Sequence, residues 1–319
     1  MPQLASMADS NDKFASFSRI GNVCSAAMIS SKLINAKSNG GGSIGSRRKD
    51  VMGQSKQRRT GLGKCIYCGV TDDLSDEHIL PYALGGTLVL RQASCKRCAT
   101  ITGSLEQRLL RGHWWPYRKK LGLQTRNPDA SKERKRVKIT KTDGTIIDAE
   151  MPLESFVAAM VFKLDPPAIL SGIEANGEPY AKEAFVKQLG AMPTEAVVDG
   201  KRYVLAPNDK VEFPVNFNSD DLTRFLAKVA HGYAISKEGV GAFCEFYLPE
   251  FILGRTDGIQ TYVGGYESPI ITQTLPGGGY NRMMVRTRGD LVSVCIQLFI
   301  DEGDPPPIYE IVVGKRPMV

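Results

Sequence analysis

The sequence predicts an α+β protein in which a small, cysteine-clipped module precedes a separate α+β domain that ends in an antiparallel meander. Two Cys-x-x-Cys motifs with 26 residues between them indicate the module. An apolar stripe from Leu222 to Tyr233, at i, i+3, i+4, i+7 spacing, indicates the main helix of the second domain. Three strand-like runs near the carboxyl end, at 282–287, 291–299 and 308–313, indicate the meander.

The amino-terminal half divides into three predicted segments. Residues 1–60 are rich in Ser and Gly and end in two basic clusters, which is typical of a disordered basic tail. Residues 61–125 form the clipped module, in which a helix over 99–115 packs back on the cysteines through apolar residues four apart. Residues 126–150 are expected to form a charged linker and then a hairpin with its turn at Asp143-Gly144.

The second domain, residues 151–319, opens with a predicted short helix at 154–163. The main helix is expected to start after Ser219-Asp220, which can cap its first turn, and to end near Gly239. His231 lies off its apolar stripe and is interpreted as a surface residue. This domain contains no motif with recognisable chemistry, so its role is left open.

Positive charge is concentrated around the cysteine motifs, within a net charge of +7. Residues 1–64 carry 11 Lys and Arg against 3 Asp and Glu, residues 91–141 carry 15 against 3, and residues 151–319 carry 15 against 21. A basic footprint on one module favours a polyanionic partner, so we expect nucleic acid, most readily double-stranded DNA. No apolar run approaches the roughly 18 residues that a membrane span needs, and no membrane partner is expected.

The four clip cysteines are Cys65, Cys68, Cys95 and Cys98. Each Cys-x-x-Cys turn presents two thiolates, and two such turns complete the tetrahedral sulfur shell that Zn²⁺ prefers. The chain has seven cysteines, an odd number that fits no closed disulfide framework. The sequence therefore predicts a structural zinc and a reducing, cytoplasmic location.

An acid–acid–His string, Asp76-Glu77-His78, lies between the two clips. Hydrolysis of a phosphodiester needs a base that activates water, for which a neutral imidazole is suited. It also needs a sink for negative charge, which a divalent cation held by carboxylates supplies. In an extended strand Asp76 and His78 face the same side, which favours Asp76 as the metal partner, whereas a turn would let Glu77 and His78 converge.

Over residues 61–112 the chain resembles the HNH endonuclease family of the zinc-clipped, ββα-metal type. The motifs that carry the resemblance are, in order, Cys-x-x-Cys, Asp-Glu-His-Ile-x-Pro from Asp76 to Pro81, Leu84-Gly85-Gly86, and Cys-x-x-Cys. The resemblance implies that His78 is the general base and that Glu77, immediately before it, is a ligand of the catalytic metal. It also implies a structural zinc separate from a catalytic Mg²⁺ or similar divalent ion.

Ala99 departs from the family pattern, because such sequences commonly carry Asn or His directly after the last cysteine. Either the site is degenerate or another ligand replaces the missing one. Glu106 lies on the same helical face about two turns further on, and we interpret it as the replacement ligand.

Basic residues around this helix are candidates for phosphate contacts: Arg97, Arg108, Arg111, Lys119 and Lys120. Trp114 and Trp115 are candidates for base stacking, although at least one is expected to be a core residue. The leading hypothesis is a metal-dependent nuclease that cleaves DNA. The alternatives are a non-catalytic zinc module that binds DNA or RNA, and a main activity in residues 150–319 with the clip as an accessory.

Overall fold

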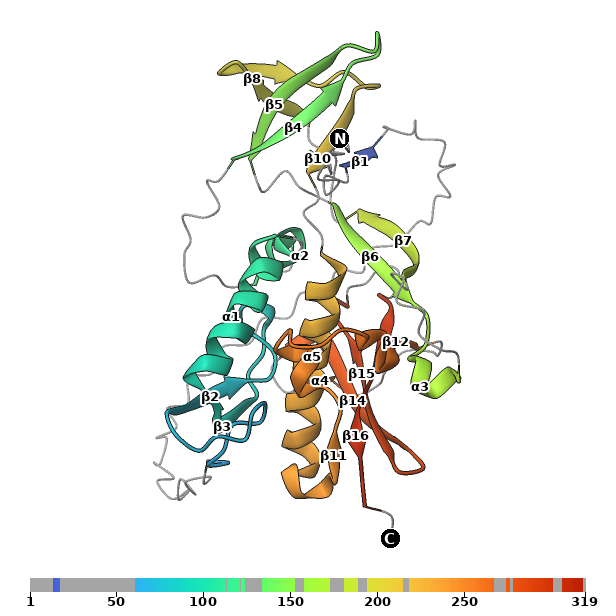
Figure 1. Ribbon diagram of the computed structural model, residues 1–319. Helices are drawn as coiled ribbons and strands as arrows, with labels where there is room; N and C mark the ends of the chain where they lie inside the picture. Colours follow the sequence, from blue (N-terminus) through green and yellow to red (C-terminus); the bar gives the residue numbers. More distant parts are fainter. Residues whose placement is uncertain are drawn as a thin grey trace, which may run out of the picture.

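The computed structural model describes residues 14–17, 61–112, 114–120, 122–123, 134–152, 158–172, 181–188, 194–214, 218–266, 274–275, 278–300 and 306–317. It shows a mixed protein of helices and antiparallel sheets, which confirms the predicted fold class. Helix α4 (Ser219–Glu238) runs between the cysteine module and the C-terminal sheet, as Figure 1 shows. Within the described residues no helix is both long and apolar enough to span a membrane.

The cysteine module has the predicted ββα order. Its elements are β2 (Leu74–His78), the short 3-10 helix η1 (Tyr82–Leu84), β3 (Val89–Cys95), α1 (Lys96–Arg111) and α2 (Trp115–Lys120). Strands β2 and β3 pair antiparallel, with His78 opposite Val89. Leu105 and Leu109 of α1 are buried, as their spacing predicts. Helix α1 stops at Gly112, earlier than expected, and Pro116 lies within the first turn of α2 rather than ending α1.

A six-stranded antiparallel sheet forms the upper part of Figure 1. In spatial order its strands are β1 (Phe14–Phe17), β10 (Lys210–Pro214), β4 (Arg134–Thr140), β5 (Ile146–Pro152), β8 (Glu195–Val198) and β9 (Lys201–Val204). The hairpin predicted around Asp143-Gly144 is present as β4 and β5. Its buried residues, including Ile139 and Met151, form a small core of their own. Apart from β1, the predicted tail at 1–60 lies outside the described residues.

The carboxyl-terminal part contains the predicted meander. The sheet consists of β13 (Thr274–Leu275), β14 (Gly278–Arg288), β15 (Leu291–Gln297), β16 (Ile308–Lys315) and β11 (Glu245–Phe246), with β12 (Val263–Tyr266) also paired to β16. Antiparallel pairing of β14 with β15 and of β15 with β16 confirms the prediction. The short helical elements around it are α3 (Ala168–Ser171), η4 (Val240–Ala242), α5 (Pro249–Ile252) and η5 (Ile259–Thr261).

The prediction of a helix at 154–163 is wrong. Strand β6 (Ala158–Leu164) occupies most of this stretch and pairs antiparallel with β7 (Ala181–Gln188). Phe162 and Leu164 are buried while Lys163 between them is exposed, which is the two-residue alternation of a strand. A short apolar run fits both the two-residue period of a strand and the 3.6-residue period of a helix. The pairing with β7, and not the local sequence, therefore decides the structure of this segment.

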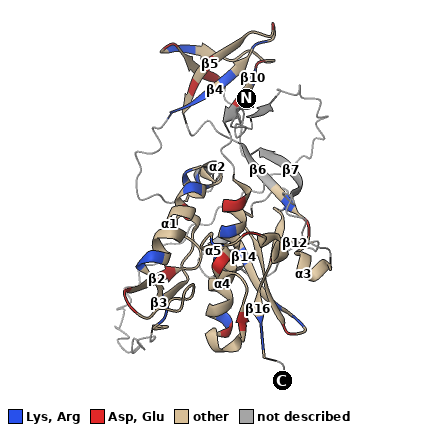
Figure 2. Ribbon diagram, viewed as in Figure 1, with Lys and Arg blue, Asp and Glu red and all other residues tan. Residues whose placement is uncertain are grey.

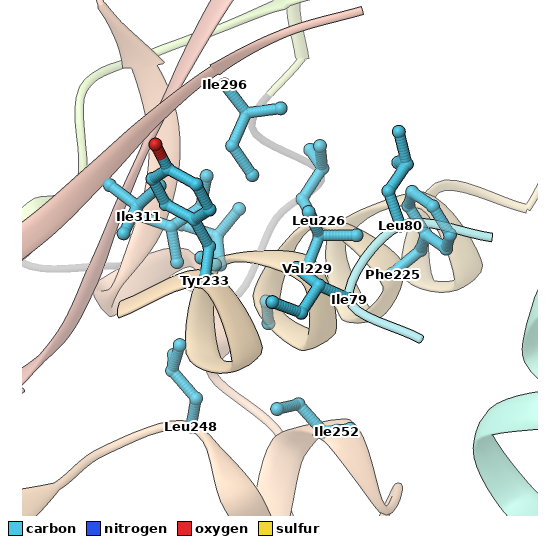
Figure 3. Packing of buried hydrophobic residues seen from close by; sticks show 14 of the residues in the cluster. Ile79, Leu80, Phe225, Leu226, Val229, Tyr233, Leu248, Ile252, Ile296 and Ile311 are labelled. Carbon is cyan, nitrogen blue, oxygen red and sulfur yellow. The ribbon is translucent and has the colours of Figure 1, made fainter. Parts of the chain in front are cut away.

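Helix α4 carries the main core. Its N-cap is Asn218, one residue earlier than predicted, and the side-chain oxygen of Asn218 accepts hydrogen bonds from the backbone N–H groups of Asp220 (2.9 Å) and Asp221 (3.4 Å). The helix ends before Gly239, as predicted. Figure 3 shows Ile79 and Leu80, from the loop after β2, packed against apolar side chains of α4.

One continuous core joins the cysteine module, α4 and the C-terminal sheet, whereas the sequence predicted a second domain separate from the module. Ile79 and Leu80 are each 1% exposed. A Cβ at Gly232 of α4 would lie 3.4 Å from a side-chain carbon of Ile79, which shows how closely the loop approaches the helix. The segment that follows His78 is therefore fixed by burial against a helix about 150 residues away in sequence.

Candidate active site

The four clip cysteines form a compact sulfur cluster. Their Sγ atoms all lie within 4.8 Å of one another, and Cys68 Sγ is 3.7 Å from Cys95 Sγ. With Zn–S bonds of about 2.3 Å, a tetrahedral site places its sulfurs about 3.8 Å apart. Cys65, Cys95 and Cys98 are buried, so the cluster is shielded from water. The donor set and spacing fit a structural zinc.

Local backbone geometry forms each clip. The first is a tight turn in which the Gly69 N–H donates to the Cys65 carbonyl at 2.9 Å, and Gly69 has a φ of 77°. The second lies where β3 passes into α1, with Cys95 as the N-cap of the helix. Burial acts to raise the pKa of the Cys95 thiol, but the backbone N–H of Cys98 and the neighbouring thiols lower it to about 7. Burial raises the pKa of the Cys68 and Cys98 thiols of the same cluster, so binding of a metal ion there must displace their protons.

The acid–acid–His string occupies the end of β2. Glu77 is buried, whereas Asp76 and His78 are exposed, as alternation along a strand requires. Asp76 Oδ1 accepts a hydrogen bond from the Gln92 N–H at 3.0 Å. The strand thus separates the two acids, and Glu77 is the one directed into the protein.

The glycine pair closes the loop after His78. Gly85 has a φ of 79° and donates its N–H to the carbonyl of Tyr82 at 2.8 Å. A Cβ on Gly86 would lie 2.0 Å from the carbonyl oxygen of Leu80, which only a glycine can approach so closely. Both glycines therefore allow the tight backbone turns of the loop that follows His78.

Glu77 and Glu106 meet at the ammonium group of Lys228, from the middle of α4. Lys228 Nζ lies 2.8 Å from Glu77 Oε1 and 2.7 Å from Glu106 Oε1. The same ammonium donates to the carbonyl oxygens of His78 and, at 3.2 Å, of Ile79. The Lys228 side chain is 1% exposed, so its ammonium group is shielded from water.

The ionisable groups in this cluster shift one another's pKa values. Burial acts to lower the pKa of Lys228, but Glu77 and Glu106 outweigh it, so the pKa is raised and the ammonium stays protonated. Burial raises the pKa of Glu106 while Lys228 acts in the opposite direction. Burial, followed by the charge of Glu77, raises the pKa of Tyr67 well above its usual value. Tyr67 therefore adds a neutral hydroxyl beside the acids.

In this arrangement Lys228 binds one oxygen of Glu77 and one of Glu106, so a divalent cation cannot bind those two oxygens at the same time. Within the described ranges, the four cysteines are the only group of three or more Cys, His, Asp or Glu residues whose ligand atoms converge on one point. The structure brings the predicted ligands Glu77 and Glu106 together at Lys228. It does not bring Asp76 into the same group.

Lys228 is not predicted from the sequence, and the interpretation of His231 as a surface residue is wrong. His231 is fully buried, with Nε2 2.8 Å from the carbonyl oxygen of Ile66 in the first clip. Its ring lies 5.8 Å from that of Tyr67 and 4.9 Å from that of Phe246, measured between centroids. A usable signal was present, because residues 65–90 contain four acids and no Lys or Arg, so a buried acid there needs a cation from elsewhere.

The residues predicted to bind phosphate differ in their availability. Arg97 and Arg111 are exposed on α1. Arg108 is bound to Asp221 of α4 through two hydrogen bonds of 2.7 Å, from Nε and Nη2. Figure 2 shows the basic positions of α1 and α2 in blue; the side chains of Lys119 and Lys120 lie outside the description.

Both tryptophans of the chain are buried, so neither is presented for base stacking. The ring of Trp114 packs edge-on against Phe225 of α4 with a centroid distance of 4.6 Å. The two predicted stacking residues are therefore core residues.

Comparison with protein families identifies the segment that contains this site. Residues 65–112 match the family model of the HNH endonucleases. The match begins at Cys65, ends just after α1, and encloses both clips, His78 and the acid pair. It confirms the resemblance over this HNH segment and supports nuclease activity on nucleic acid. No curated protein and no solved structure matched the chain.

Proposed function

We propose that this chain is a metal-dependent endonuclease that hydrolyses phosphodiester bonds of DNA, with His78 as the general base. The observation that carries the proposal is the position of His78 in the HNH segment, where it is exposed at the end of β2 and follows the buried Glu77 in sequence. An exposed imidazole is accessible to a water molecule and to a phosphate, and in its neutral form it accepts a proton from that water.

The backbone beneath His78 is rigid. Its carbonyl accepts a hydrogen bond from Lys228, and the next residue, Ile79, donates its N–H to the Leu88 carbonyl at 3.1 Å. Ile79 is also buried against α4. A base must be held within hydrogen-bond reach of the attacking water, so a fixed backbone supports this role.

Acidic residues near His78 are proposed to hold the catalytic cation, Mg²⁺ or a similar divalent ion. Glu77 and Glu106 are the first candidates, since their carboxylates converge, and Asp76 is the candidate on the exposed side of β2. A bound cation would neutralise charge on the phosphate. This part of the proposal requires Lys228 to release the two glutamates.

Double-stranded DNA is the proposed substrate, with phosphates bound along α1 and α2. Arg97 and Arg111 supply exposed guanidinium groups, and Lys119 and Lys120 continue the basic run. Arg108 is proposed to contribute less than these, because Asp221 already binds its guanidinium group. Binding of this kind weakens steeply as salt concentration rises.

Zn²⁺ is proposed as the ion of the cysteine cluster, with a structural function. Four reduced thiols are needed to bind it, so we propose that the protein works in the cytoplasm, where thiols stay reduced.

Nicking of supercoiled plasmid tests the proposed function. In Mg²⁺ or Mn²⁺ the wild-type protein is expected to convert plasmid to the open circular form, and His78→Ala to do so at least 100-fold more slowly, the usual contribution of a general base. Gln107→Ala, at an exposed position of α1, is the matched control and should retain wild-type rates. Equal rates for wild type and His78→Ala would refute the role of His78.

A second candidate is a non-catalytic zinc module that binds DNA or RNA. The observation that favours it is the engagement of both glutamates by Lys228, together with Ala99 at the position where the family commonly carries a metal ligand. This candidate predicts salt-sensitive binding of nucleic acid that survives His78→Ala, with no nicking by the wild-type protein in either metal.

A further inference from the structure

We propose that Lys228 is a built-in competitor for the divalent cation, holding Glu77 and Glu106 in a latched state that a metal ion must displace. This inference rests on the proposed function, since it concerns the same acid pair. It also assigns a role to the C-terminal part of the chain, because α4 delivers the competing charge to the HNH segment.

The ammonium has the environment of a bound cation. Four oxygens surround Nζ, from the carboxylates of Glu77 and Glu106 and from the carbonyls of His78 and Ile79. Carboxylate and carbonyl oxygens are also the ligands that hard divalent cations take. An ammonium and a divalent cation cannot share the same carboxylate oxygens, because each excludes the other by volume and by charge.

One face of α4 fixes Lys228 in place. Residues 221, 228 and 231 lie close together around the helix axis, and each binds the HNH segment. Asp221 binds Arg108 of α1, Lys228 binds the acid pair, and His231 binds the Ile66 carbonyl beside the first clip. The helix is thus anchored on both sides of Lys228, so the ammonium is delivered by a fixed element and not by a mobile surface side chain.

Burial makes this competition strong. The Lys228 side chain is 1% exposed and that of Glu77 is 7% exposed, so water replaces neither partner while α4 stays docked. A cation that takes over the glutamates must leave the ammonium with carbonyl partners alone or move it out of the core. The affinity of the acid pair for metal is therefore set by Lys228.

The test is Mn²⁺ binding to the full-length, zinc-loaded protein without DNA, measured by the paramagnetic resonance signal of free Mn²⁺. Lys228→Met keeps the length of the side chain and removes its charge. We expect Lys228→Met to bind one Mn²⁺ at least tenfold more tightly than wild type, and Lys228→Met/Glu106→Gln to lose that gain. Lys237→Met, at an exposed position of the same helix, is the matched control and should bind as wild type does.

Equal Mn²⁺ affinity in wild type and in folded Lys228→Met would overturn the proposal. Zinc content and circular dichroism establish whether the variant is folded. If Lys228→Met does not fold, Mn²⁺ binding is compared between wild type and Glu106→Gln. A tight Mn²⁺ site in wild type that Glu106→Gln abolishes would overturn the proposal. Mn²⁺ binding that Glu106→Gln leaves unchanged would support it.

Plasmid nicking separates the latch from the proposed function. If Lys228→Met gains Mn²⁺ affinity and none of the proteins nicks DNA, the latch stands and the nuclease proposal fails. If wild type nicks DNA with unchanged Mn²⁺ affinity in Lys228→Met, the nuclease proposal stands and the latch fails.

Discussion

Acidification should destabilise the protein through His231. Burial lowers the pKa of this imidazole to about 4, from an ordinary value of 6.5, against smaller opposing effects of the Ile66 carbonyl and Glu77. Above pH 6.5 the imidazole is neutral in the folded and unfolded states alike. As pH falls from 6.5 towards 4 the unfolded chain takes up a proton that the folded protein cannot accept, so stability is lost across that window.

The magnitude follows from the two pKa values. Between pH 7 and pH 5 the linkage removes about 2 kcal/mol from the free energy of unfolding, and the full loss below pH 4 is about 3 kcal/mol. His231→Gln replaces the imidazole with an amide that does not titrate but can still donate to the Ile66 carbonyl. The variant should therefore lose about 2 kcal/mol less than wild type over the same pH change.

Urea unfolding at pH 7 and pH 5 measures this difference, with excess zinc in both buffers. The fluorescence of Trp114 and Trp115, both buried, reports unfolding. Protonation of the zinc thiolates affects both proteins alike and cancels in the comparison. Lys237→Gln, on the same helix and exposed, is the control. If wild type and His231→Gln lose the same free energy between pH 7 and pH 5, the burial of a neutral His231 is refuted.

Three further predictions concern the cation of the acid pair, the zinc and the basic helix. Lys228→Ala should lower the free energy of unfolding by about 3–5 kcal/mol, because the buried carboxylate of Glu77 and the partly buried one of Glu106 lose their partner; a loss under about 1 kcal/mol in urea unfolding would contradict this. Cys98→Ser should abolish the single zinc measured by atomic absorption and, with it, the near-ultraviolet circular dichroism of the clipped module. A variant that keeps its zinc would show that the sulfurs do not share it. Arg111→Ala should reduce the slope of log affinity against log salt concentration for DNA binding by about 1, the effect of one lost phosphate contact. Arg108→Ala should leave this slope unchanged, because Asp221 already binds that side chain. Equal slopes for the two variants would show that Arg108 and Arg111 do not differ in phosphate binding.

Local patterns were sufficient to predict much of the fold. The Cys-x-x-Cys pairs predicted the sulfur cluster because their chemistry is encoded within a few residues. The stripe from Leu222 to Tyr233 predicted α4, and the apolar runs predicted the order of β14, β15 and β16. Each of these features depends on residues that are near in sequence or on a regular spacing of apolar residues.

Features that depend on distant partners were not predictable in this way. Lys228 is separated from His78 by 150 residues, so no local pattern links them. On the helix alone, Lys228 and His231 lie off the apolar stripe and are expected in water, but α4 is covered on both sides and buries them. Strand β6 was missed for the same reason, since its pairing with β7 overrides an ambiguous local sequence.

The most direct test of His78 as the general base is rescue of His78→Gly by added imidazole in the plasmid nicking assay. The side chain is exposed, so a free imidazole can enter the space that the substitution leaves. We expect His78→Gly to nick plasmid at least 100-fold more slowly than wild type, and added imidazole to restore the rate in proportion to its concentration. A His78→Gly protein that nicks at the wild-type rate without imidazole would refute His78 as the general base.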